Sequence, residues 1–157
     1  MSDFSFRPAA PDDAPLIVAL LRELADYEKL QPVFHLDEAA VRRDMMGAAC
    51  RCELAFAGDA PAGITSWYWT YKSFRAARGL FVEDLYVRPD FRGQGLGRRM
   101  LARLAGEALA VGGFLEWQVL GWNEPAITFY KSLGAVEQPH WLNYRLQDAA
   151  LKELAET

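Results

Sequence analysis

Three glycines alternate with other residues in the segment Arg92-Gly93-Gln94-Gly95-Leu96-Gly97. Glycine lacks a Cβ, so the backbone of such a segment can adopt positive φ and can approach a ligand closely. Apolar residues recur at helical spacing from Leu96 to Leu109, which predicts a helix whose unpaired first-turn N–H groups attract an anion. We interpret the segment as an anion-binding loop. The alternative is a flexible loop with solvated arginines.

Three arginines, Arg92, Arg98 and Arg99, lie at the start of the same helix. A cation at an exposed helix N-terminus is unfavourable by about 0.3–1 kcal/mol, and a bound polyphosphate would reverse that sign. A dinucleotide fingerprint starting at Gly93 would need a glycine where Arg98 stands, and the chain has no Gly-Lys-Ser/Thr run of a P-loop. The loop therefore indicates a phosphate-bearing ligand, bound by a motif that is neither the dinucleotide fingerprint nor the P-loop.

Two other segments carry groups that could transfer protons. Glu83 and Asp84 interrupt an otherwise apolar strand pattern at residues 80–87. Successive side chains of a strand face opposite sides, so we expect Asp84 to face away from Glu83 unless a bulge re-aims it. A solvated or salt-bridged carboxylate is the alternative for Glu83. Tyr130 follows the expected helix cap Asn123, and its helical spacing with apolar neighbours also fits a core tyrosine.

The patterns of apolar, glycine and proline residues predict the elements that position these groups. Strands are expected at residues 4–8, 51–57, 62–71, 80–87, 114–120 and 141–146, and helices at 11–28, 37–47, 96–111, 124–133 and from 148 onward. The link over 72–79 is expected to be a loop. This order predicts an α+β fold with helices on a mostly antiparallel sheet, in a single domain over residues 1–157.

Composition narrows the function classes. With 17 basic and 21 acidic residues the net charge is −4, which gives no nucleic-acid footprint. The N-terminus lacks the apolar core of a signal peptide, and no apolar run approaches the roughly 18 residues of a membrane span. Cys50 and Cys52 would share one face of a strand and could not easily bridge each other. We expect free thiols, no metal site and a reducing cytoplasm.

The glycine segment resembles the pyrophosphate loop of the GCN5-related N-acetyltransferases, Arg/Gln-x-x-Gly-x-Gly/Ala, and the element order matches that family from about Phe6 to Leu146. Four fragments further resemble its diamine (spermidine/spermine) and thialysine acetyltransferase branch, namely residues 22–30, 82–87, 122–125 and 129–135. The resemblance implies a GNAT-type fold, acetyl-CoA as cofactor and a small primary amine as acetyl acceptor. Relatives in the branch are usually two-fold dimers.

The resemblance also implies roles for individual residues. An alkylammonium has a pKa of about 10.4, so its deprotonation at pH 7 costs about 4–5 kcal/mol unless a base assists. Glu83 matches the glutamate that takes this proton through a water, and Tyr130 matches the tyrosine that protonates the leaving thiolate. Cofactor contacts are implied at Leu85, Tyr86, Val87, Arg92, Gly93, Gln94, Gly95, Leu96, Gly97, Arg98, Asn123 and Lys131. Substrate contacts are implied at Tyr27, Glu28, Glu83, Asp84 and Trp141.

The chain departs from the branch at two places. Lys72 stands where the diamine enzymes have an acidic or neutral residue, which would repel a long polycation and favours a shorter, lysine-like amine. Arg98 stands where relatives usually have a serine, and it could contact phosphate or be solvated. Two other functions are considered beside acetylation of a small amine. The chain could acetylate a protein or peptide amine, or it could be a non-catalytic acyl-CoA sensor. A sensor would need neither Glu83 nor Tyr130.

Overall fold

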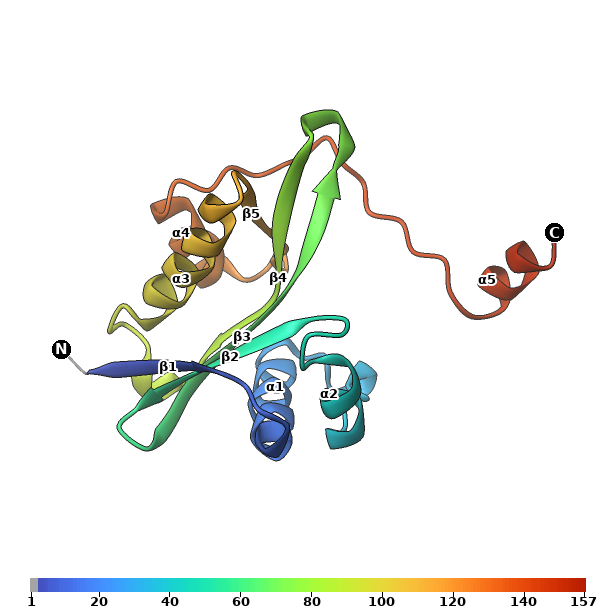
Figure 1. Cartoon of the computed structure of the whole chain (residues 1–157). Coiled ribbons are helices and arrows are strands. Elements are labelled where there is room, and N and C mark those ends of the chain that lie inside the picture. Colours follow the sequence, from blue (N-terminus) through green and yellow to red (C-terminus); the bar gives the residue numbers. More distant parts are fainter. Residues whose placement is uncertain (1–2) are drawn as a thin grey trace. The chain divides into compact units, whose positions relative to one another are not determined.

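The computed structural model describes residues 3–157 (Figure 1). They divide into two compact units, one extending to Gln118 and the other covering Val119–Thr157. None of the helices within residues 3–157 combines the length and the apolar character needed to cross a bilayer. The two units are described in turn.

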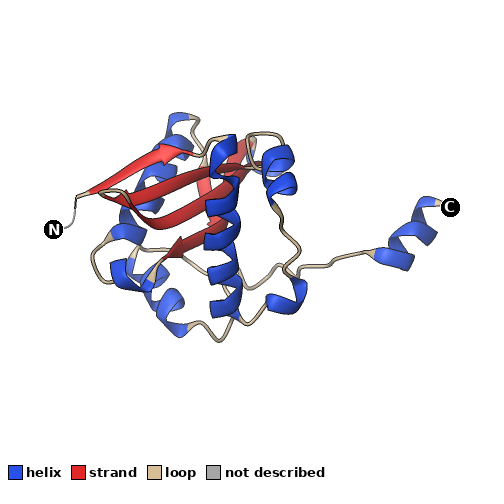
Figure 2. Ribbon diagram, turned by 90° about the horizontal axis from the view of Figure 1, so that it is seen from below, coloured by secondary structure: helices blue, strands red, loops and turns tan. Residues whose placement is uncertain are grey.

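The first unit is built on a five-stranded sheet whose spatial order follows the chain. Its strands are β1 (Phe4–Pro8), β2 (Arg51–Ala57), β3 (Ala60–Lys72), β4 (Ala77–Val87) and β5 (Phe114–Trp117). The first four strands pair antiparallel with their neighbours, and β5 alone runs parallel to β4 (Figure 2). The prediction of a mostly antiparallel sheet with helices packed on it is confirmed.

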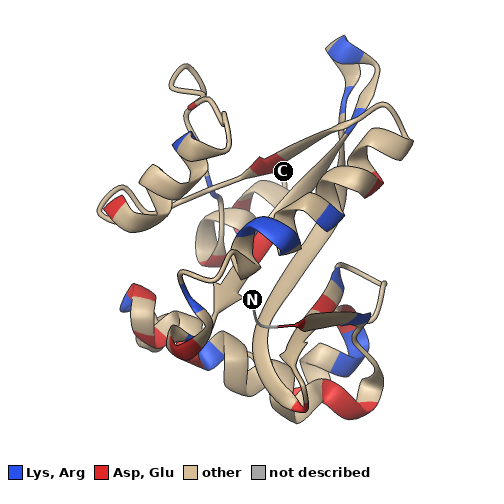
Figure 3. Ribbon diagram, turned by 90° about the vertical axis from the view of Figure 1, so that its left-hand side faces the viewer, with Lys and Arg blue, Asp and Glu red and all other residues tan. Residues whose placement is uncertain are grey.

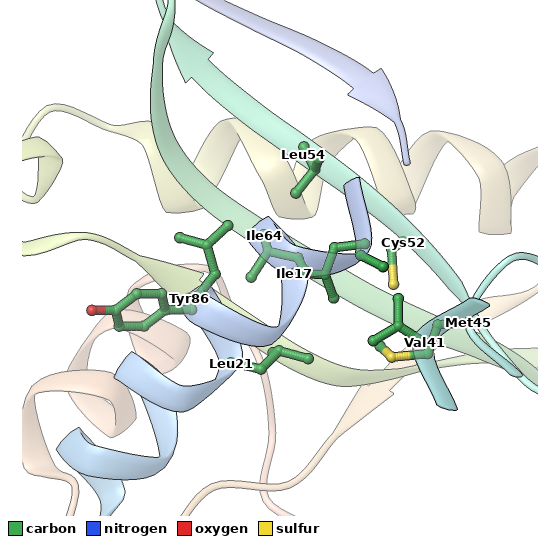
Figure 4. Packing of buried hydrophobic residues seen from close by; sticks show 10 residues of the cluster. Ile17, Leu21, Val41, Met45, Cys52, Leu54, Ile64 and Tyr86 are labelled. Carbon is green, nitrogen blue, oxygen red and sulfur yellow. The ribbon is translucent and has the colours of Figure 1, made fainter. Parts of the chain in front are cut away.

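Helices cover both faces of this sheet. Apolar side chains of α1 (Ala14–Glu28) and α2 (Glu38–Asp44) pack with Leu54 and Ile64 in one buried cluster (Figure 4). Side chains of α3 (Leu96–Ala110) pack with Ala55 in a second cluster. Neighbouring residues of β2 contribute to different clusters because side chains alternate across a strand. The two clusters therefore lie on opposite faces.

The long hairpin of β3 and β4 differs from the expectation. β3 continues to Lys72 and β4 already begins at Ala77, so most of the expected loop over 72–79 is strand, joined by a short 3-10 turn at Ser73–Arg75. Paired backbone hydrogen bonds extend this ribbon, although its sequence is basic and has a weak strand pattern. In contrast, β5 ends at Trp117 and is shorter than the predicted strand at 114–120.

The second unit contains α4 (Glu124–Ser132) and α5 (Asp148–Ala155). Asn123 caps α4 as predicted, since its side-chain oxygen accepts a hydrogen bond from the backbone N–H of Ala126 at 3.4 Å. The predicted strand over 141–146 is wrong: this segment has no regular secondary structure, and Trp141 and Tyr144 are 78% and 91% exposed. Alternating apolar residues form a strand only where another strand offers backbone partners, and none pairs with this segment within residues 3–157.

Candidate active site

The sheet opens between β4 and β5. β5 pairs with β4 only over Gly79–Val82, whereas β4 continues to Val87 in pairing with β3. Among the described strands, none occupies the far side of β4 beyond Val82. Alternate backbone groups of the segment 83–87 therefore point to an edge without a strand partner, where an N–H can polarise a bound carbonyl. The predicted cofactor positions Leu85, Tyr86 and Val87 lie on this edge.

A β-bulge places Glu83. In the pairing of β3 with β4, Ser66 lies opposite Asp84 and the next residue, Trp67, lies opposite Val82. Glu83 is therefore the extra residue of the bulge, and strict alternation between Glu83 and Asp84 is broken. The expected opposite orientation of Asp84 does not occur, because the bulge re-aims the strand.

Both carboxylates line one cavity of about 290 Å³. A third carboxylate, Glu28 at the C-terminal end of α1, lines it as well. The remaining lining is apolar and consists of Leu21, Leu24, Ala25, Leu30, Val33, Phe34, Leu36 and Met45. Tyr27, which precedes Glu28, lies beside the glycine loop, with its ring 5.1 Å from the guanidinium carbon of Arg92. An apolar cavity with three acids is complementary to an aliphatic cation.

The carboxyl of Asp84 has a pKa raised to about 6. Burial is the main cause, and the negative charges of Glu83 and Glu28 add to it, while a hydrogen bond donated by the hydroxyl of Ser66 opposes it. Burial also raises the pKa of Glu28. The cavity therefore holds carboxylates whose ionised forms are costly unless a cation is bound beside them.

Replacing Asp84 by asparagine should stabilise the folded protein at pH 8. The folded carboxyl titrates near pH 6 and an unfolded one near 3.8, so its contribution to stability is present below about pH 4 and is lost as the pH rises through 6. The ionised carboxyl thus lowers the free energy of unfolding by about 3 kcal/mol at pH 8. Replacing it by the neutral amide should raise the unfolding temperature by roughly 6–12 °C at that pH. Thermal denaturation of Asp84→Asn, with the exposed Asp59→Asn as control, measures the difference. A gain that is equally large at pH 3.5 would contradict the assigned cause.

Two hydroxyl-bearing residues of β3, Tyr68 and Ser66, lie beside the carboxylates of Glu83 and Asp84. The pKa of the Tyr68 hydroxyl is raised by burial, by the charge of Glu83 and by a hydrogen bond with it. Tyr68 stacks on Phe81 at 5.2 Å between ring centroids. Sequence reasoning missed both Tyr68 and Ser66, since only the register of β3 against β4 shows which hydroxyls lie beside the carboxylates.

The charge of Lys72 is compensated in the structure. Its Nζ lies 3.0 Å from Oε2 of Glu116 on β5. The basic residues Lys72, Arg75 and Arg78 gather at the end of the β3–β4 hairpin (Figure 3). Because Glu116 pairs with Lys72, the expected repulsion of a long polycation is weaker than the sequence suggested.

The glycine loop has the predicted backbone conformation at two of its three glycines. Gly93 and Gly95 have φ of 73° and 79°, and an added Cβ at either would meet no atom within 4 Å. Gly97 lies within α3. Gly95 is the N-cap residue, and no side chain of the described residues caps the helix. The first-turn N–H groups of α3 therefore face open space where an anion could bind.

The three arginines at this helix start differ in their contacts. Nε of Arg92 donates to the backbone oxygen of Val87 at 2.9 Å, and Nη2 of Arg99 donates to the backbone oxygen of Phe4 at 3.0 Å. Arg98 is exposed, and within residues 3–157 its guanidinium has no hydrogen bond or ion pair. Gln94 donates to the backbone oxygen of Asp90 at 3.0 Å. All three arginines are exposed and keep guanidinium N–H donors for a phosphate, but Arg92 and Arg99 each hold a backbone oxygen with one nitrogen.

Four predicted site residues belong to the second unit. Asn123 is buried at the start of α4, and Tyr130 and Lys131 lie in its last turns. The ring of Tyr130 lies 5.4 Å from that of Phe129. Trp141 lies in the irregular segment that follows. The structure thus brings Tyr27, Glu28, Glu83, Asp84 and the glycine loop together in the first unit, and the roles of the four residues in the second unit stay predictions.

A match to a protein-family model shows the family to which this chain belongs. Residues 17–135 match the model described as the acetyltransferase (GNAT) family. The chain belongs to this family. It is an acyltransferase, and the expected GNAT-type α+β fold is confirmed.

Individual relatives agree with the family match. The chain is 33% identical over 160 residues to a thialysine N-epsilon-acetyltransferase from Caenorhabditis elegans and 35% identical over 169 residues to one from Bos taurus, and each alignment covers 99% of both proteins. Among solved structures, an integron cassette protein from V. cholerae superposes with a TM-score of 0.81 at 22% identity, covering 100% of this chain and 99% of that one. This last likeness shows the fold alone.

Proposed function

We propose that this GNAT enzyme transfers the acetyl group of acetyl-CoA to a primary amine of a small cationic substrate, either a diamine or polyamine or a lysine-like amino acid such as thialysine. The observation that carries the proposal is the cavity in which Glu28, Glu83 and Asp84 converge among apolar side chains. An aliphatic chain would contact the apolar walls and an ammonium group would pair with the acids. The relatives named as thialysine acetyltransferases support the same substrate class.

The cofactor would lie along the glycine loop and the open edge of β4. Members of the GNAT family use acetyl-CoA, and the uncapped N–H groups at the start of α3 fit its pyrophosphate. Within the loop we assign the pyrophosphate to residues 92–98, with Arg98 as the side-chain contact. The thioester carbonyl would receive a backbone N–H from Leu85, Tyr86 or Val87. Asn123 and Lys131 are proposed as additional cofactor contacts.

In the proposed reaction, acetyl transfer is direct. Glu83 accepts a proton from the substrate ammonium through a water, and the resulting neutral nitrogen attacks the thioester carbon. The new C–N bond forms as the C–S bond breaks, and Tyr130 donates its hydroxyl proton to the departing thiolate. The acetylated nitrogen then gives up its second proton to the Tyr130 phenolate, which restores the hydroxyl and leaves a neutral amide. Tyr68, whose hydroxyl interacts with Glu83, would help to orient the carboxylate.

Substrate choice follows from charge. The Lys72–Glu116 pair weakens the main reason for excluding a long polycation, so both short and long amines are proposed as substrates. An amino acid substrate would also present a carboxylate, which the three acids of the cavity would repel unless a cation lies beside it. We propose Tyr27 and Trp141 as aromatic contacts to the aliphatic part.

We also propose that residues 1–157 act as one N-acetyltransferase domain, since the family match continues across the boundary between the two units. A homodimer is proposed as well. The segment 141–146 carries exposed, alternating apolar side chains, which a second copy could pair and bury. The free thiols of Cys50 and Cys52 fit a reducing cytoplasm.

A thiol-release assay tests the proposed function. Purified protein is given acetyl-CoA with diamines, spermidine, thialysine, lysine, ornithine and short peptides, and calorimetry measures acetyl-CoA binding alone. We expect turnover of at least one small amine. Turnover of peptides only would favour a protein acetyltransferase, and tight binding without any turnover would favour a sensor. No binding of acetyl-CoA would overturn the proposal.

A further inference from the structure

Ser66 contributes a buried hydroxyl directly behind the acidic wall of the cavity. It lies in β3, is fully buried, and is paired in register with Asp84 across the bulge. Its Oγ donates a hydrogen bond to Oδ2 of Asp84. Ser66 itself does not line the cavity, whereas Asp84 does. A hydroxyl in this position can only reach a substrate through the carboxylate that it holds.

The other groups around Asp84 disfavour its negative charge. Glu83 on the same strand and Glu28 at the end of α1 are acidic and raise its pKa, as does burial. The other titratable groups that interact with Asp84 are the thiols of Cys50, just before β2, and Cys52 in β2. The residues of the 30–36 segment and α2 region that line this cavity are apolar: Leu30, Val33, Phe34, Leu36 and Met45. Among these neighbours, Ser66 alone stabilises the carboxylate. Without the Ser66 hydroxyl, only the substrate cation would stabilise the negative charge of Asp84.

We propose that Ser66 is a positioning residue that keeps the Asp84 carboxylate ionised and aimed into the cavity, and so sets the lowest pH at which the enzyme accepts a cationic amine. This inference rests on the proposed function of the cavity. Sequence patterns offer no sign of the pairing, since a serine within a strand is ordinarily an unremarkable core or surface residue. The bulge at Glu83 creates it, because it brings Asp84 rather than Glu83 opposite Ser66.

The adjacent hydroxyl of Thr65 supplies a matched control. Thr65 is also buried, and its Oγ1 has no hydrogen-bond partner among the described residues. Thr65→Val removes this hydroxyl at constant shape and leaves Asp84 untouched. Ser66→Ala removes the hydrogen bond to Asp84, and Ser66→Cys replaces the hydroxyl by a weaker donor of similar size.

The first measurement is a carbon-13 NMR titration of the Asp84 carboxyl in the protein without substrate. Assignment uses Asp84→Asn, whose spectrum lacks the signal. We expect the titration midpoint to move upward by about one pH unit in Ser66→Ala and by less in Ser66→Cys, and not to move in Thr65→Val. This readout needs no activity, so it separates a failure of the inference from a failure of the proposed function.

The second measurement is the pH dependence of KM and kcat for the best amine of the substrate panel. Ser66→Ala should raise KM about fivefold near pH 6 and leave it nearly unchanged at pH 8.5, where Asp84 is ionised in either protein. A merely structural role would lower kcat at every pH. Superimposable titrations and KM profiles of wild type and Ser66→Ala would overturn the inference. If Ser66→Ala does not fold, the same comparison is decided by Ser66→Cys.

Discussion

Tyr130→Phe is expected to lower kcat by about 10²- to 10⁴-fold while the Kd for acetyl-CoA changes less than about twofold. The substitution removes only the hydroxyl that is proposed to protonate the departing thiolate. The ring keeps its contact with Phe129, whose centroid lies 5.4 Å away. Steady-state kinetics with the best amine, together with calorimetry of acetyl-CoA binding, measure the two quantities separately.

Tyr144→Phe is the matched control for this prediction. Tyr144 belongs to the same unit and is 91% exposed, so removal of its hydroxyl should leave kcat unchanged. If Tyr130→Phe weakens acetyl-CoA binding as much as it lowers kcat, the hydroxyl binds the cofactor and does not donate a proton. Unchanged kcat would make Tyr130 a packing residue of α4.

Glu83→Gln is expected to lower kcat/KM at pH 7 by about 10²- to 10⁴-fold and to move the pH optimum upward. Without a base, the reaction depends on the free amine already present in solution, and this fraction rises about tenfold per pH unit until the amine pKa near 10.4. The defect should therefore shrink steadily as the pH is raised from 7 to 9.5. Complete pH–rate profiles of both proteins, with the same amine, measure this recovery.

The exposed Glu107→Gln on α3 controls for the loss of a negative charge. Its profile should match that of the wild type. If Glu83→Gln keeps the wild-type profile, Glu83 is not the base, and Asp84 becomes the better candidate because it lines the same cavity and titrates near pH 6. A defect of equal size at every pH would indicate that Glu83 only binds the substrate.

Several features of this chain follow from local sequence. Glycine at positions 93 and 95 permits the positive φ observed there, and the apolar spacing from Leu96 predicts α3 in its observed place. Asn123 caps α4 as expected, and Asp37, the first residue of the helix predicted over 37–47, caps α2. These predictions hold because they depend on backbone conformation, capping and periodicity within a few residues.

Features that depend on pairing between distant segments were not predictable in the same way. The segment 141–146 has the apolar alternation of a strand but no partner among the described strands and forms none. The hairpin of β3 and β4, in contrast, extends through a sequence that resembles a loop. Arg92 and Arg99 are held by the backbone of Val87 and Phe4, and Lys72 by Glu116. In each case the partner is distant in sequence or its geometry depends on the fold.

By itself, the sequence determined the glycine loop, the helix behind it, the mostly antiparallel sheet and the family to which the chain belongs. Only the tertiary structure decided that Glu83 and Asp84 share one cavity with Glu28, and that Ser66 holds Asp84. The physical reason is the bulge: one extra residue in β4 changes the side to which a carboxylate points, and its position is set by the register with β3. Burial in that cavity then raises the pKa of Asp84.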